Sequence, residues 1–458
     1  MKINVAIVGA GIGGLTCAIA CRRANRALQV TVIERTPEVL TIGAGIHIPP
    51  NASRILAEFG LLEKLKEAGG YQPDFFRLRR YSDGRAIAEK PLKTRTVTEY
   101  GAEWIAIHRG DYQRVLMEEA SALGVRIMTG AEVVDIVRAP SGQQNVVLKD
   151  GSCLGVDVVI GADVSLSGLW SRIRDIVLDR SFSPAATGDL AYRGTFTHAQ
   201  LKAQKNEKLD DLLQQSDIQV WLGSGKHAVF YPLRNRKEYN LVLIVADDLP
   251  PDARTLPGNS EDIAAKFVEW DPILADIISI MNSPLQWKLF HFKELDQWTK
   301  GTITLMGDAS HPTPPYQGQG AAMAVEDGAI LGLFLGKFQK YTVPASQDDK
   351  MRLLSSLFGL YEDLRKDRTK VNVEGAVHTR HYYHLPDGPE QRARDKALAE
   401  LPLKDWKFSC SFNWGDAEYQ RSLLGFDVLA DAVAKYDDWQ NAIYRICALT
   451  MPKNIFIP

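Results

Sequence analysis

Glycines at fixed spacing follow the first apolar segment of the chain. The motif GAGIGG spans residues 9–14 and comes directly after the run INVAIV at residues 3–8. In a G-x-G-x-x-G turn, Gly9 permits the tight turn, Gly11 lets a pyrophosphate approach the backbone, and Gly14 allows close packing of helix on strand. The start of the following helix would present free N–H groups and a partial positive charge to phosphates.

An acidic residue stands where the ribose of such a ligand would lie. Glu34 follows Gly14 by about 20 residues and ends the apolar run VTVIE at residues 30–34. A carboxylate there accepts hydrogen bonds from ribose hydroxyls. The glycine motif alone is a weak signal, but its combination with Glu34 predicts a dinucleotide-binding site.

A second constellation favours one particular dinucleotide. In LMGDASHPTPPYQGQGA (residues 305–321), a strand ends at Asp308, a Pro-rich loop follows, and Gly318 and Gly320 precede another helix. The Asp308 carboxylate suits the hydroxyls of a ribityl chain. The helix start near Gly320 and Ala321 suits a group that becomes anionic, such as the N1–C2=O edge of a reduced flavin. The segment therefore favours FAD.

These motifs require particular elements around them. INVAIV, a helical pattern to about Ala24 and VTVIE form a β–α–β unit. A helix over residues 52–68 with Asn51 as its N-cap is predicted next. The segment at residues 75–89, FFRLRRYSDGRAIAE, predicts a hairpin, and a second helix is predicted over residues 111–123.

Longer alternating strands, from about Leu190 to Ala246, predict a separate antiparallel sheet. The fold class is therefore α/β (α+β), with a Rossmann-like FAD domain, an inserted antiparallel-sheet substrate domain and a helical C-terminal region. The predicted divisions are residues 1–70, 102–180 and 295–335 for the FAD domain, 71–101 and 181–294 for the substrate domain, and 336–458 for the helical region.

Composition and charge narrow the class of protein. The chain has 458 residues, 45% of them hydrophobic and 24% charged, which indicates a folded protein rather than a disordered one. A net charge of −2 without a basic block argues against nucleic acid as a partner. The chain contains no apolar run of about 18 residues, so no transmembrane helix is predicted. A first strand at Ile3 and five cysteines without CxxC spacing favour a reducing, cytoplasmic location.

The order of the motifs resembles a known family. GAGIGG with Glu34, HRGDYQRVL with Arg109, the interrupted GAD…GLWSRIR and GDASHPTPPYQGQG follow one another as in single-component FAD-dependent aromatic monooxygenases. The para-hydroxybenzoate and salicylate hydroxylases belong to this family. The tail HYYHLPDGPEQRARD (residues 381–395) is similar to fungal enzymes of the group, many of which act in secondary metabolism.

The resemblance implies a set of site residues. Arg193 in AYRG would orient a phenolate or carbonyl, or act as an acid toward a departing oxygen, and Tyr231 in FYPLR would hydrogen-bond the substrate. Alternatively, both are ordinary strand residues with polar tips in solvent. His47 would touch the substrate or bond the loop backbone. The implied cofactor-binding residues are Gly9, Gly11, Gly14, Glu34, Arg35, Ala44, Gly45, Arg109, Asp163, Asp308, Gly318, Gly320 and Ala321.

The resemblance also implies the reaction. Because the chain has one G-x-G-x-x-G, NAD(P)H would visit transiently to reduce FAD, and O2 would form a flavin C4a-hydroperoxide. That species would hydroxylate or epoxidise a small electron-rich aromatic, a phenol or an indole alkaloid, with the enzyme a monomer or homodimer. The alternatives are an FAD-dependent oxidase or dehydrogenase without oxygen insertion, and a non-catalytic FAD-fold protein of the prenyl-protein escort type.

Two features depart from the simple pattern. VSLS at residues 164–167 displaces Gly168 from Asp163, and a surface bulge is the favoured outcome because a longer loop adds little closure entropy. The alternative is a shift of Asp163 away from its arginine partner. His378, His381 and His384 recur every three residues, but no fourth ligand is evident, so a helix end is favoured and no metal site is predicted.

Overall fold

A six-stranded sheet carries the glycine turn. The computed structural model describes residues 2–38, 44–164, 169–400 and 410–450. The sheet has the order β18-β19-β11-β1-β2-β7 and is parallel except for β18. Its strands are β1 (Asn4–Val8), β2 (Gln29–Ile33), β7 (Arg126–Met128), β11 (Val158–Gly161), β18 (Thr299–Lys300) and β19 (Ile303–Leu305).

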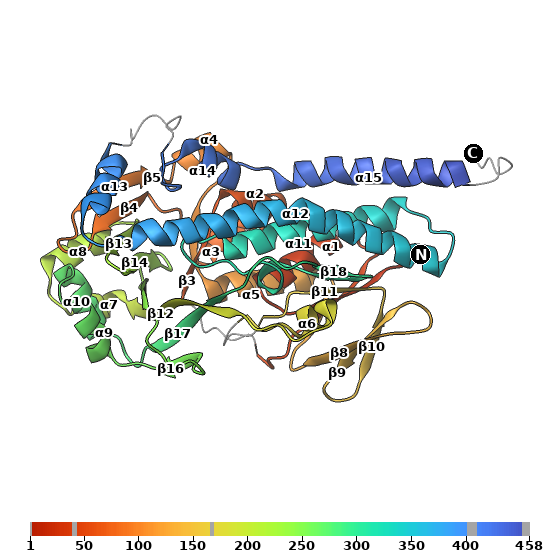
Figure 1. The fold of residues 1–458 in the computed structure, drawn as a ribbon, viewed down its shortest axis with the longest axis horizontal. Coiled ribbons are helices and arrows are strands. Elements are labelled where there is room, and N and C mark those ends of the chain that lie inside the picture. The colour runs from red at the N-terminus through yellow and green to blue at the C-terminus, as the bar shows by residue number, and fades with distance from the viewer. Residues whose placement is uncertain (1, 39–43, 165–168, 401–409, 451–458) are drawn as a thin grey trace.

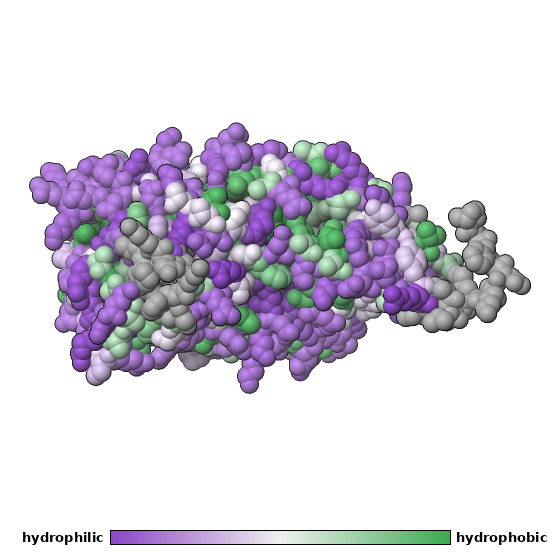
Figure 2. All heavy atoms as spheres, turned by 90° about the horizontal axis from the view of Figure 1, so that it is seen from above, coloured by the Kyte–Doolittle hydropathy of each residue, from purple (hydrophilic) through white to green (hydrophobic). Residues whose placement is uncertain are grey.

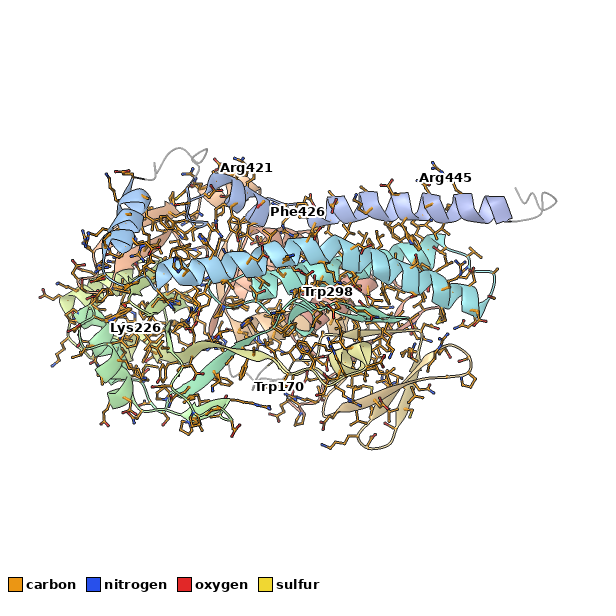
Figure 3. All side chains as sticks on the ribbon, viewed as in Figure 1. Trp170, Lys226, Trp298, Arg421, Phe426 and Arg445 are labelled. Atoms are coloured by element: carbon orange, nitrogen blue, oxygen red, sulfur yellow. The ribbon has the colours of Figure 1, made fainter. Side chains whose placement is uncertain are left out.

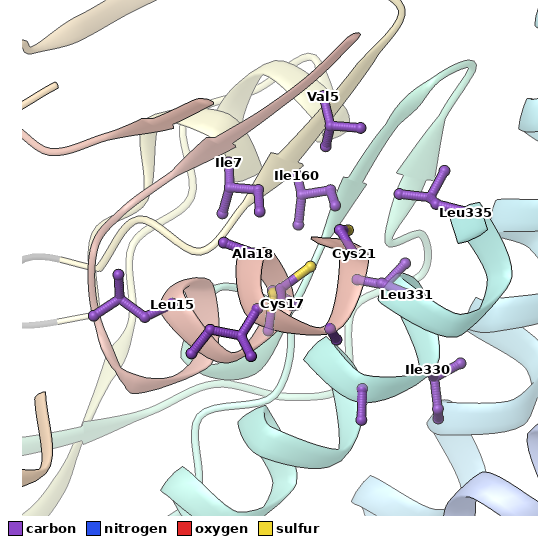
Figure 4. Packing of buried hydrophobic residues seen from close by; sticks show 14 of the residues in the cluster. Val5, Ile7, Leu15, Cys17, Ala18, Cys21, Ile160, Ile330, Leu331 and Leu335 are labelled. Atoms are coloured by element: carbon purple, nitrogen blue, oxygen red, sulfur yellow. The ribbon is translucent and has the colours of Figure 1, made fainter. Parts of the chain in front are cut away.

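Helices cover this sheet because its central strands β1, β11 and β19 are buried along nearly their whole length. The helix α1 (Ile12–Ala24) lies between the sheet and α11 (Gly320–Tyr341), and α5 (Arg109–Ala122) packs beside it. Figure 4 shows the contact, in which Cys17 and Cys21 are buried as free thiols among aliphatic side chains. The β–α–β unit predicted from the sequence is therefore present, and it fixes where the glycine turn lies.

The helix predicted over residues 52–68 is wrong in part. The structure has two helices, α2 (Pro50–Glu58) and α3 (Leu62–Glu67), because Gly60 adopts a left-handed φ of 64° between them. Asn51 is not the N-cap of α2, since Pro49 holds that position. The Asn51 amide is instead buried and donates to Glu326 Oε1 at 2.7 Å.

A second, eight-stranded sheet forms the predicted insertion. Its order is β16-β17-β12-β15-β14-β13-β4-β5, and all pairs are antiparallel except β4 with β13. The hairpin predicted at residues 75–89 supplies two edge strands, as β4 and β5. The strands are β4 (Phe75–Arg80), β5 (Ala86–Pro91), β12 (Ala185–Thr197), β13 (Ile218–Gly223), β14 (Lys226–Leu233), β15 (Glu238–Ala246), β16 (Thr255–Pro257) and β17 (Leu285–His291).

One face of this sheet packs against an apolar cluster, and the other face lines a cavity. On β14, Ala228 and Phe230 join an apolar cluster, whereas Val229 and Tyr231 point to a cavity on the opposite face. This alternation follows the period of two in a strand. The cluster is completed by side chains from α7 (His198–Lys202), α8 (Glu207–Gln214), α9 (Ser260–Lys266) and α10 (Pro272–Ser279).

Smaller elements connect the two sheets. A three-stranded sheet and the antiparallel pair β3–β6 are separate from the two large sheets, and β3 lines the same cavity as the glycine turn. The remaining elements are β3 (Gly45–Ile48), β6 (Ile105–His108), β8 (Val133–Arg138), β9 (Gln144–Leu148), β10 (Cys153–Val156), α4 (Arg95–Tyr100), α6 (Arg172–Leu178) and the short helix η1 (Gly307–Ala309).

The C-terminal region is helical, as predicted. The helix α12 (Gln347–Tyr383) runs beside α11, and its end reaches the eight-stranded sheet (Figure 1). The helix α15 (Val428–Thr450) lies along the outside, and its Tyr436 ring packs 5.7 Å from Phe334 of α11, measured between ring centroids. Two shorter helices, α13 (Pro389–Ala399) and α14 (Ala417–Leu424), separate these long ones. The domain boundaries themselves stay a prediction.

The surface is mainly hydrophilic on the face seen in Figure 2, with apolar side chains scattered over it. Within the described ranges, no helix is both long and apolar enough to span a bilayer. The same part of the chain contains no group of three His, Cys, Asp or Glu side chains placed to hold a metal ion.

Candidate active site

A cavity of about 720 Å³ lies where the two large sheets meet. Its volume is within the range of cofactor and ligand pockets in enzymes. Both the glycine turn and the inserted sheet contribute to its wall. It is lined by every predicted site residue except Ala44, namely Gly9, Gly11, Gly14, Glu34, Arg35, Gly45, His47, Arg109, Asp163, Arg193, Tyr231, Asp308, Gly318, Gly320 and Ala321.

Two helices begin at this cavity without side-chain caps. Gly11 precedes α1 and Gln319 precedes α11, and neither helix start has a side chain bonded to its first N–H groups. A Cβ added at Gly11 would meet no protein atom within 4 Å, so open space lies in front of the turn. Free N–H groups beside open space suit an anionic ligand such as a pyrophosphate.

Glu34 is held at the edge of the same cavity. Its Oε2 accepts from the Ala10 N–H at 2.9 Å, and its Oε1 accepts from the Thr36 N–H at 3.0 Å and the Thr36 hydroxyl at 2.9 Å. These bonds tie the end of β2 to the glycine turn. The carboxylate is therefore fixed where a ribose could reach it.

Asp308 and Arg109 both line the cavity, and the charge of each affects the pKa of the other. Burial raises the pKa of Asp308, and the nearby charges of His311 and Arg109 oppose that rise. Burial lowers the pKa of Arg109, and the Asp308 carboxylate opposes that effect. Ala44 does not line the cavity, but its carbonyl accepts from the Arg109 N–H at 3.2 Å and so positions that backbone.

The rings of His47 and Tyr231 pack in a tilted arrangement in the cavity wall, with centroids 4.5 Å apart and planes at 44°. Burial lowers the pKa of His47 to about 4, so this imidazole is neutral at pH 7. The Trp104 Nε1–H points at its Nδ1 at 3.5 Å, which is a long contact. Burial also raises the pKa of Tyr231, so its hydroxyl keeps its proton and can donate.

Arg193 projects into the cavity from β12. Its side chain is exposed to solvent within the cavity. Desolvation by the surrounding protein nevertheless lowers its pKa, and the positive charge of Arg109 lowers it further. Its guanidinium forms no hydrogen bond or ion pair with any residue that the structure describes. An arginine that faces a cavity in this way offers its charge and its planar donors to a ligand.

The flanks of the inserted VSLS segment stay together. Asp163 accepts from the Ser171 hydroxyl at 2.7 Å and from the backbone N–H groups of Arg172 at 2.7 Å and Ile173 at 3.1 Å. Burial raises the pKa of this carboxyl to about 6. Residues 165–168, which include the predicted Gly168, lie outside the described residues. Asp163 thus holds the start of α6 while it lines the cavity.

Trp170 follows the insertion and also lines the cavity. The ring of Trp170, which is labelled in Figure 3, packs against the guanidinium of Arg254, whose Cζ lies 3.6 Å from the ring centroid. It also packs edge-on against Phe290, with ring centroids 5.4 Å apart. Both partners belong to the segment that carries the eight-stranded sheet. The chain after the insertion therefore contacts that sheet region through an aromatic side chain.

A buried ionic network supports the start of α11. Asp327 accepts from Arg365 Nε at 2.6 Å and lies 2.6 Å from His311 Nε2, while Glu326 accepts from Arg365 at 2.7 Å and from Arg368 at 2.6 Å. The other partners of these two acids are Asn51 of α2, which donates to Glu326, and the Gly307 N–H of η1, which donates to Asp327 at 2.8 Å. The network holds His311 away from the cavity, so its place is structural.

The sequence did not single out one histidine of this site or the histidine that contacts it. His227 lines the cavity, and its Nδ1 lies 2.8 Å from Nε2 of His384. The alternation of side chains along a strand indicates His227 as a site residue, because His227 and Tyr231 lie on the same face of β14. His384 is one of the three regularly spaced histidines at 378, 381 and 384. The structure does not bring these three together as ligands, because His384 contacts His227 and His381 pairs with Glu390 at 3.4 Å.

A smaller chamber of about 100 Å³ adjoins the cavity. The two share wall residues that include His47, His227 and Pro315. Aromatic and aliphatic side chains dominate its wall, and several come from the C-terminal region. These are Thr379, Tyr382 and Tyr383 of α12, Trp414, and Gln420, Leu423 and Leu424 of α14.

A dinucleotide cradle that opens onto the inner face of a second sheet is the arrangement of FAD-dependent aromatic monooxygenases. Comparison with known proteins agrees with this class. The chain belongs to the FAD binding domain family, whose profile matches residues 2–346.

Named relatives extend the match along most of the chain. FAD-dependent monooxygenase OpS4 of Beauveria bassiana (strain ARSEF 2860) is 33% identical over 436 residues, which is 94% of this chain and 96% of that protein. 3-Hydroxybenzoate 6-hydroxylase 1 of Aquipseudomonas alcaligenes is 33% identical over 338 residues, with 74% and 82% covered. The fold matches a salicylate hydroxylase substrate complex with a TM-score of 0.74 at 24% identity, covering 95% of this chain and 98% of that one.

The protein is therefore an FAD-dependent aromatic monooxygenase of the hydroxylase family, an oxidoreductase with NAD(P)H and O2 as its other reactants. The class predicted from the sequence is confirmed, as is FAD as the cofactor. The alternative of a non-catalytic escort-type protein is not supported, because the named relatives are monooxygenases.

Proposed function

We propose that this enzyme inserts one oxygen atom into an aromatic ring that carries an anionic group, and that Arg193 binds this group. The observation that carries the proposal is the Arg193 guanidinium, which faces the cavity and has no protein partner among the described residues. Carboxylates and phenolates pair well with a planar guanidinium, and the pairing is strong where water is limited. An indole ring without an acidic group would form no ion pair with the Arg193 guanidinium.

Different residues of the cavity are proposed to bind different parts of FAD. We infer that Glu34 holds the ribose, the start of α1 holds the pyrophosphate, and Asp308 holds the ribityl chain. Arg35, Ala44, Gly45, Arg109, Asp163 and the residues from Gly318 to Ala321 complete this set as proposed above. Bound FAD supplies the redox chemistry, which is hydride uptake from NAD(P)H and activation of O2.

Two neutral groups orient the ring beside Arg193. Tyr231 keeps its proton and can donate to a substrate oxygen, while His47 stays neutral and adds a flat apolar face. The rings of His47 and Tyr231 pack together, which restricts the rotamers of both. We propose that they position the substrate while Arg193 holds its charge.

The names of several relatives support an acidic phenol as substrate. They refer to 3-hydroxybenzoate, 3-amino-4-hydroxybenzoate and 6-hydroxynicotinate, which each carry a hydroxyl and a carboxylate on an aromatic ring. These names describe those proteins, and we transfer only the chemical class. Hydroxylation is thus favoured over epoxidation, and a role in secondary metabolism stays a prediction.

Isotope labelling tests the proposed reaction. Purified enzyme loaded with FAD is given NADPH or NADH, a panel of hydroxybenzoates and indoles, and ¹⁸O2. We expect one ¹⁸O atom in the product of an acidic phenol. Stoichiometric peroxide without any labelled product would instead identify an oxidase or dehydrogenase.

Arg193→Met tests the anion site. The variant should bind FAD and accept hydride normally, but its affinity for the acidic phenol should fall by about 30-fold or more, since losing one partner of a desolvated charge pair costs about 2–5 kcal/mol. Arg85→Met is the matched control because Arg85 lies on the exposed hairpin turn. Equal affinity for the acidic phenol in wild type and Arg193→Met would remove Arg193 from the site.

A further inference from the structure

The smaller chamber of about 100 Å³ adjoins the main cavity, and its wall contains no residue of the glycine turn. Arg193 and Tyr231 line the main cavity but not the chamber. A substituent on a ring held beside Arg193 would enter the chamber past the residues that line both spaces. These residues are His47, His227, Val229, Pro315, Gly318 and Gln319.

Most of the chamber wall is apolar. Phe76, Trp104, Val220, Trp414 and Leu423 contribute to it, and all five belong to one apolar cluster or pack against it. An apolar cavity of about 150 Å³ holds a benzene molecule, so by volume this chamber has room for about three or four carbon atoms. The wall therefore suits a short chain rather than a second ring.

Most polar side chains of the wall form their hydrogen bonds within the protein. The Gln317 amide donates to the Thr379 hydroxyl at 3.1 Å and accepts from the Tyr419 hydroxyl at 3.0 Å. Lys90 Nζ of β5 donates to Gln420 Oε1 of α14 at 2.6 Å. These bonds connect the chamber wall to the C-terminal helices.

An ion pair makes a further connection of this kind. The Tyr316 hydroxyl in the chamber wall donates to the buried carboxylate of Asp189 on β12. The same carboxylate accepts from Arg380 Nη2 of α12 at 2.6 Å. The end of α12 is thereby held against the eight-stranded sheet, so the C-terminal region limits the size of the chamber.

Gln319 differs from the other polar residues of the wall. Its side chain is buried, with 1% of the residue exposed, and it lines both the main cavity and the chamber. Its Oε1 accepts from Asn51 Nδ2 at 3.2 Å, whereas its Nε2 has no hydrogen-bond partner among the described residues. A buried amide donor without a partner is costly, and an oxygen atom of a ligand would satisfy it.

The boundary between the two spaces carries little charge. Burial lowers the pKa of His47 to about 4 and that of His227 far below its usual range. Both rings are therefore neutral at pH 7. An uncharged substituent can pass between them, whereas a second carboxylate would lose its hydration there without gaining an opposite charge from either ring.

We propose that the chamber is a specificity subsite for a short uncharged substituent on the substrate ring, and that the Gln319 amide donates to an oxygen atom of this substituent. An acyl group of three or so carbons has the required size, apolar chain and acceptor. The inference rests on the proposed function, in which Arg193 holds the anionic group of the ring. The substrate is then recognised at two places, by charge in the main cavity and by size and one hydrogen bond in the chamber.

Substituted salicylates test the chamber directly. Salicylate and its derivatives with a propyl or a propanoyl group at each free ring position are titrated into the FAD-loaded enzyme by calorimetry. At one position we expect propyl to tighten binding about tenfold or more, because three carbons become buried. Propanoyl at that position should bind about threefold to tenfold tighter again, because of the added hydrogen bond. Binding of salicylate without a gain at any position would overturn the inference.

Val220→Phe fills the chamber from β13. The gain from the propyl group, measured against the same variant's affinity for salicylate, should disappear. Leu222→Phe is the matched control, because Leu222 lies two residues further on the same strand and in the same apolar cluster but lines neither space. FAD content and thermal unfolding verify that both variants are folded. An equal gain in Val220→Phe and wild type would place the propyl group elsewhere and contradict the inference.

Gln319→Met tests the hydrogen bond without filling the chamber. Methionine is similar in length to glutamine but has no N–H donor. The ratio of propanoyl to propyl affinity should fall to about one in this variant, whatever the effect on FAD content. Gln317→Met is the matched control and should keep the wild-type ratio, since the Gln317 amide is bonded to Thr379 and Tyr419. An unchanged ratio in Gln319→Met would exclude Gln319 as the donor.

Phenols without a carboxylate separate this inference from the proposed function. Phenol, propylphenols and propanoylphenols are titrated into the same proteins. If salicylate binds no tighter than phenol, while the gain from the substituent persists and is lost in Val220→Phe, the proposed anion site is wrong and the chamber is supported. If salicylate binds tightly through Arg193 but no substituent adds affinity, the chamber is wrong and the proposed function stands.

Discussion

The aromatic ring of Tyr231 lies directly against the backbone of Gly45. A Cβ atom at Gly45 would stand 2.4 Å from Tyr231 Cε2 and 2.5 Å from its hydroxyl oxygen. The Gly45 N–H also donates to Asn240 Oδ1 of β15 at 3.0 Å. The strand β3 and the inserted sheet therefore meet at a position where only glycine fits, and this contact sets how far the Tyr231 ring extends into the cavity.

Gly45→Ala should displace Tyr231. The added methyl group overpacks the contact, which costs about 1–3 kcal/mol of stability and misplaces the hydroxyl. In a Tyr231→Ala background the same substitution should cost less, because the clashing ring is gone. Denaturant unfolding of the two single variants and the double variant measures the coupling. Additive losses would show that the two residues do not oppose each other.

Gly11→Ala should weaken FAD binding without destabilising the protein. Gly11 has a φ of −70°, which alanine also adopts, and a Cβ there meets no protein atom within 4 Å. The methyl group instead occupies the open space in front of α1, so FAD affinity should fall about tenfold to a hundredfold.

Quenching of FAD fluorescence measures this loss, and thermal unfolding of the FAD-free protein measures stability. Gly359→Ala in α12 is the control, since its Cβ also meets no protein atom. Unchanged FAD affinity in Gly11→Ala would show that the phosphates lie elsewhere.

Arg365→Met should be strongly destabilising. Arg365 is fully buried and pairs with both Glu326 and Asp327, and its loss would leave Glu326 with only Arg368, and Asp327 with only the His311 ring, as ion-pair partners among the described residues. Breaking a buried ion pair in this way costs about 3–5 kcal/mol. The neighbouring Lys366→Met, which loses a more exposed pair with Glu362, should cost less than about 1 kcal/mol. Similar unfolding free energies for the two variants would contradict this account of the network.

His47 should make the protein less stable in mild acid. Its pKa is about 6.5 when unfolded and about 4 when folded and buried, so protons bind the unfolded state first as the pH falls from 6.5 toward 4. Stability is then lost across that window, by up to about 2 kcal/mol at pH 5. His47→Gln should lose correspondingly less between pH 7 and pH 5. Unfolding free energies at both pH values measure the difference, and equal losses would show that His47 titrates normally.

Much of the cofactor side was predictable because its signals are local. The glycine spacing of residues 9–14, Glu34 at the end of the next strand, and the Gly318–Gly320 helix start each act through backbone geometry within a few residues. The fold class followed from the change between the β–α–β pattern and long alternating strands. Local signals failed at Gly60, where a left-handed residue divides one apolar pattern into two helices.

The contacts around the inserted sheet were harder to predict from the sequence, because they join segments that lie far apart in the chain. His384 was read as part of a regular histidine series, and nothing near it in sequence points to His227. Asn51 resembled a helix cap, but burial beside Glu326 gave its amide a different partner. The charge balance around Asp189 likewise depends on Arg380 and Tyr316, which come from separate elements.

The sequence by itself determined the class of enzyme, the cofactor and the general shape of the fold, because glycine turns and strand patterns are fixed by neighbouring residues. Only the tertiary structure decided which polar groups share the cavity and which are neutral there. Burial and the charges of distant segments set the pKa values of His47, His384 and Tyr231. Those quantities depend on three-dimensional packing, and the chemistry proposed for this site depends on them.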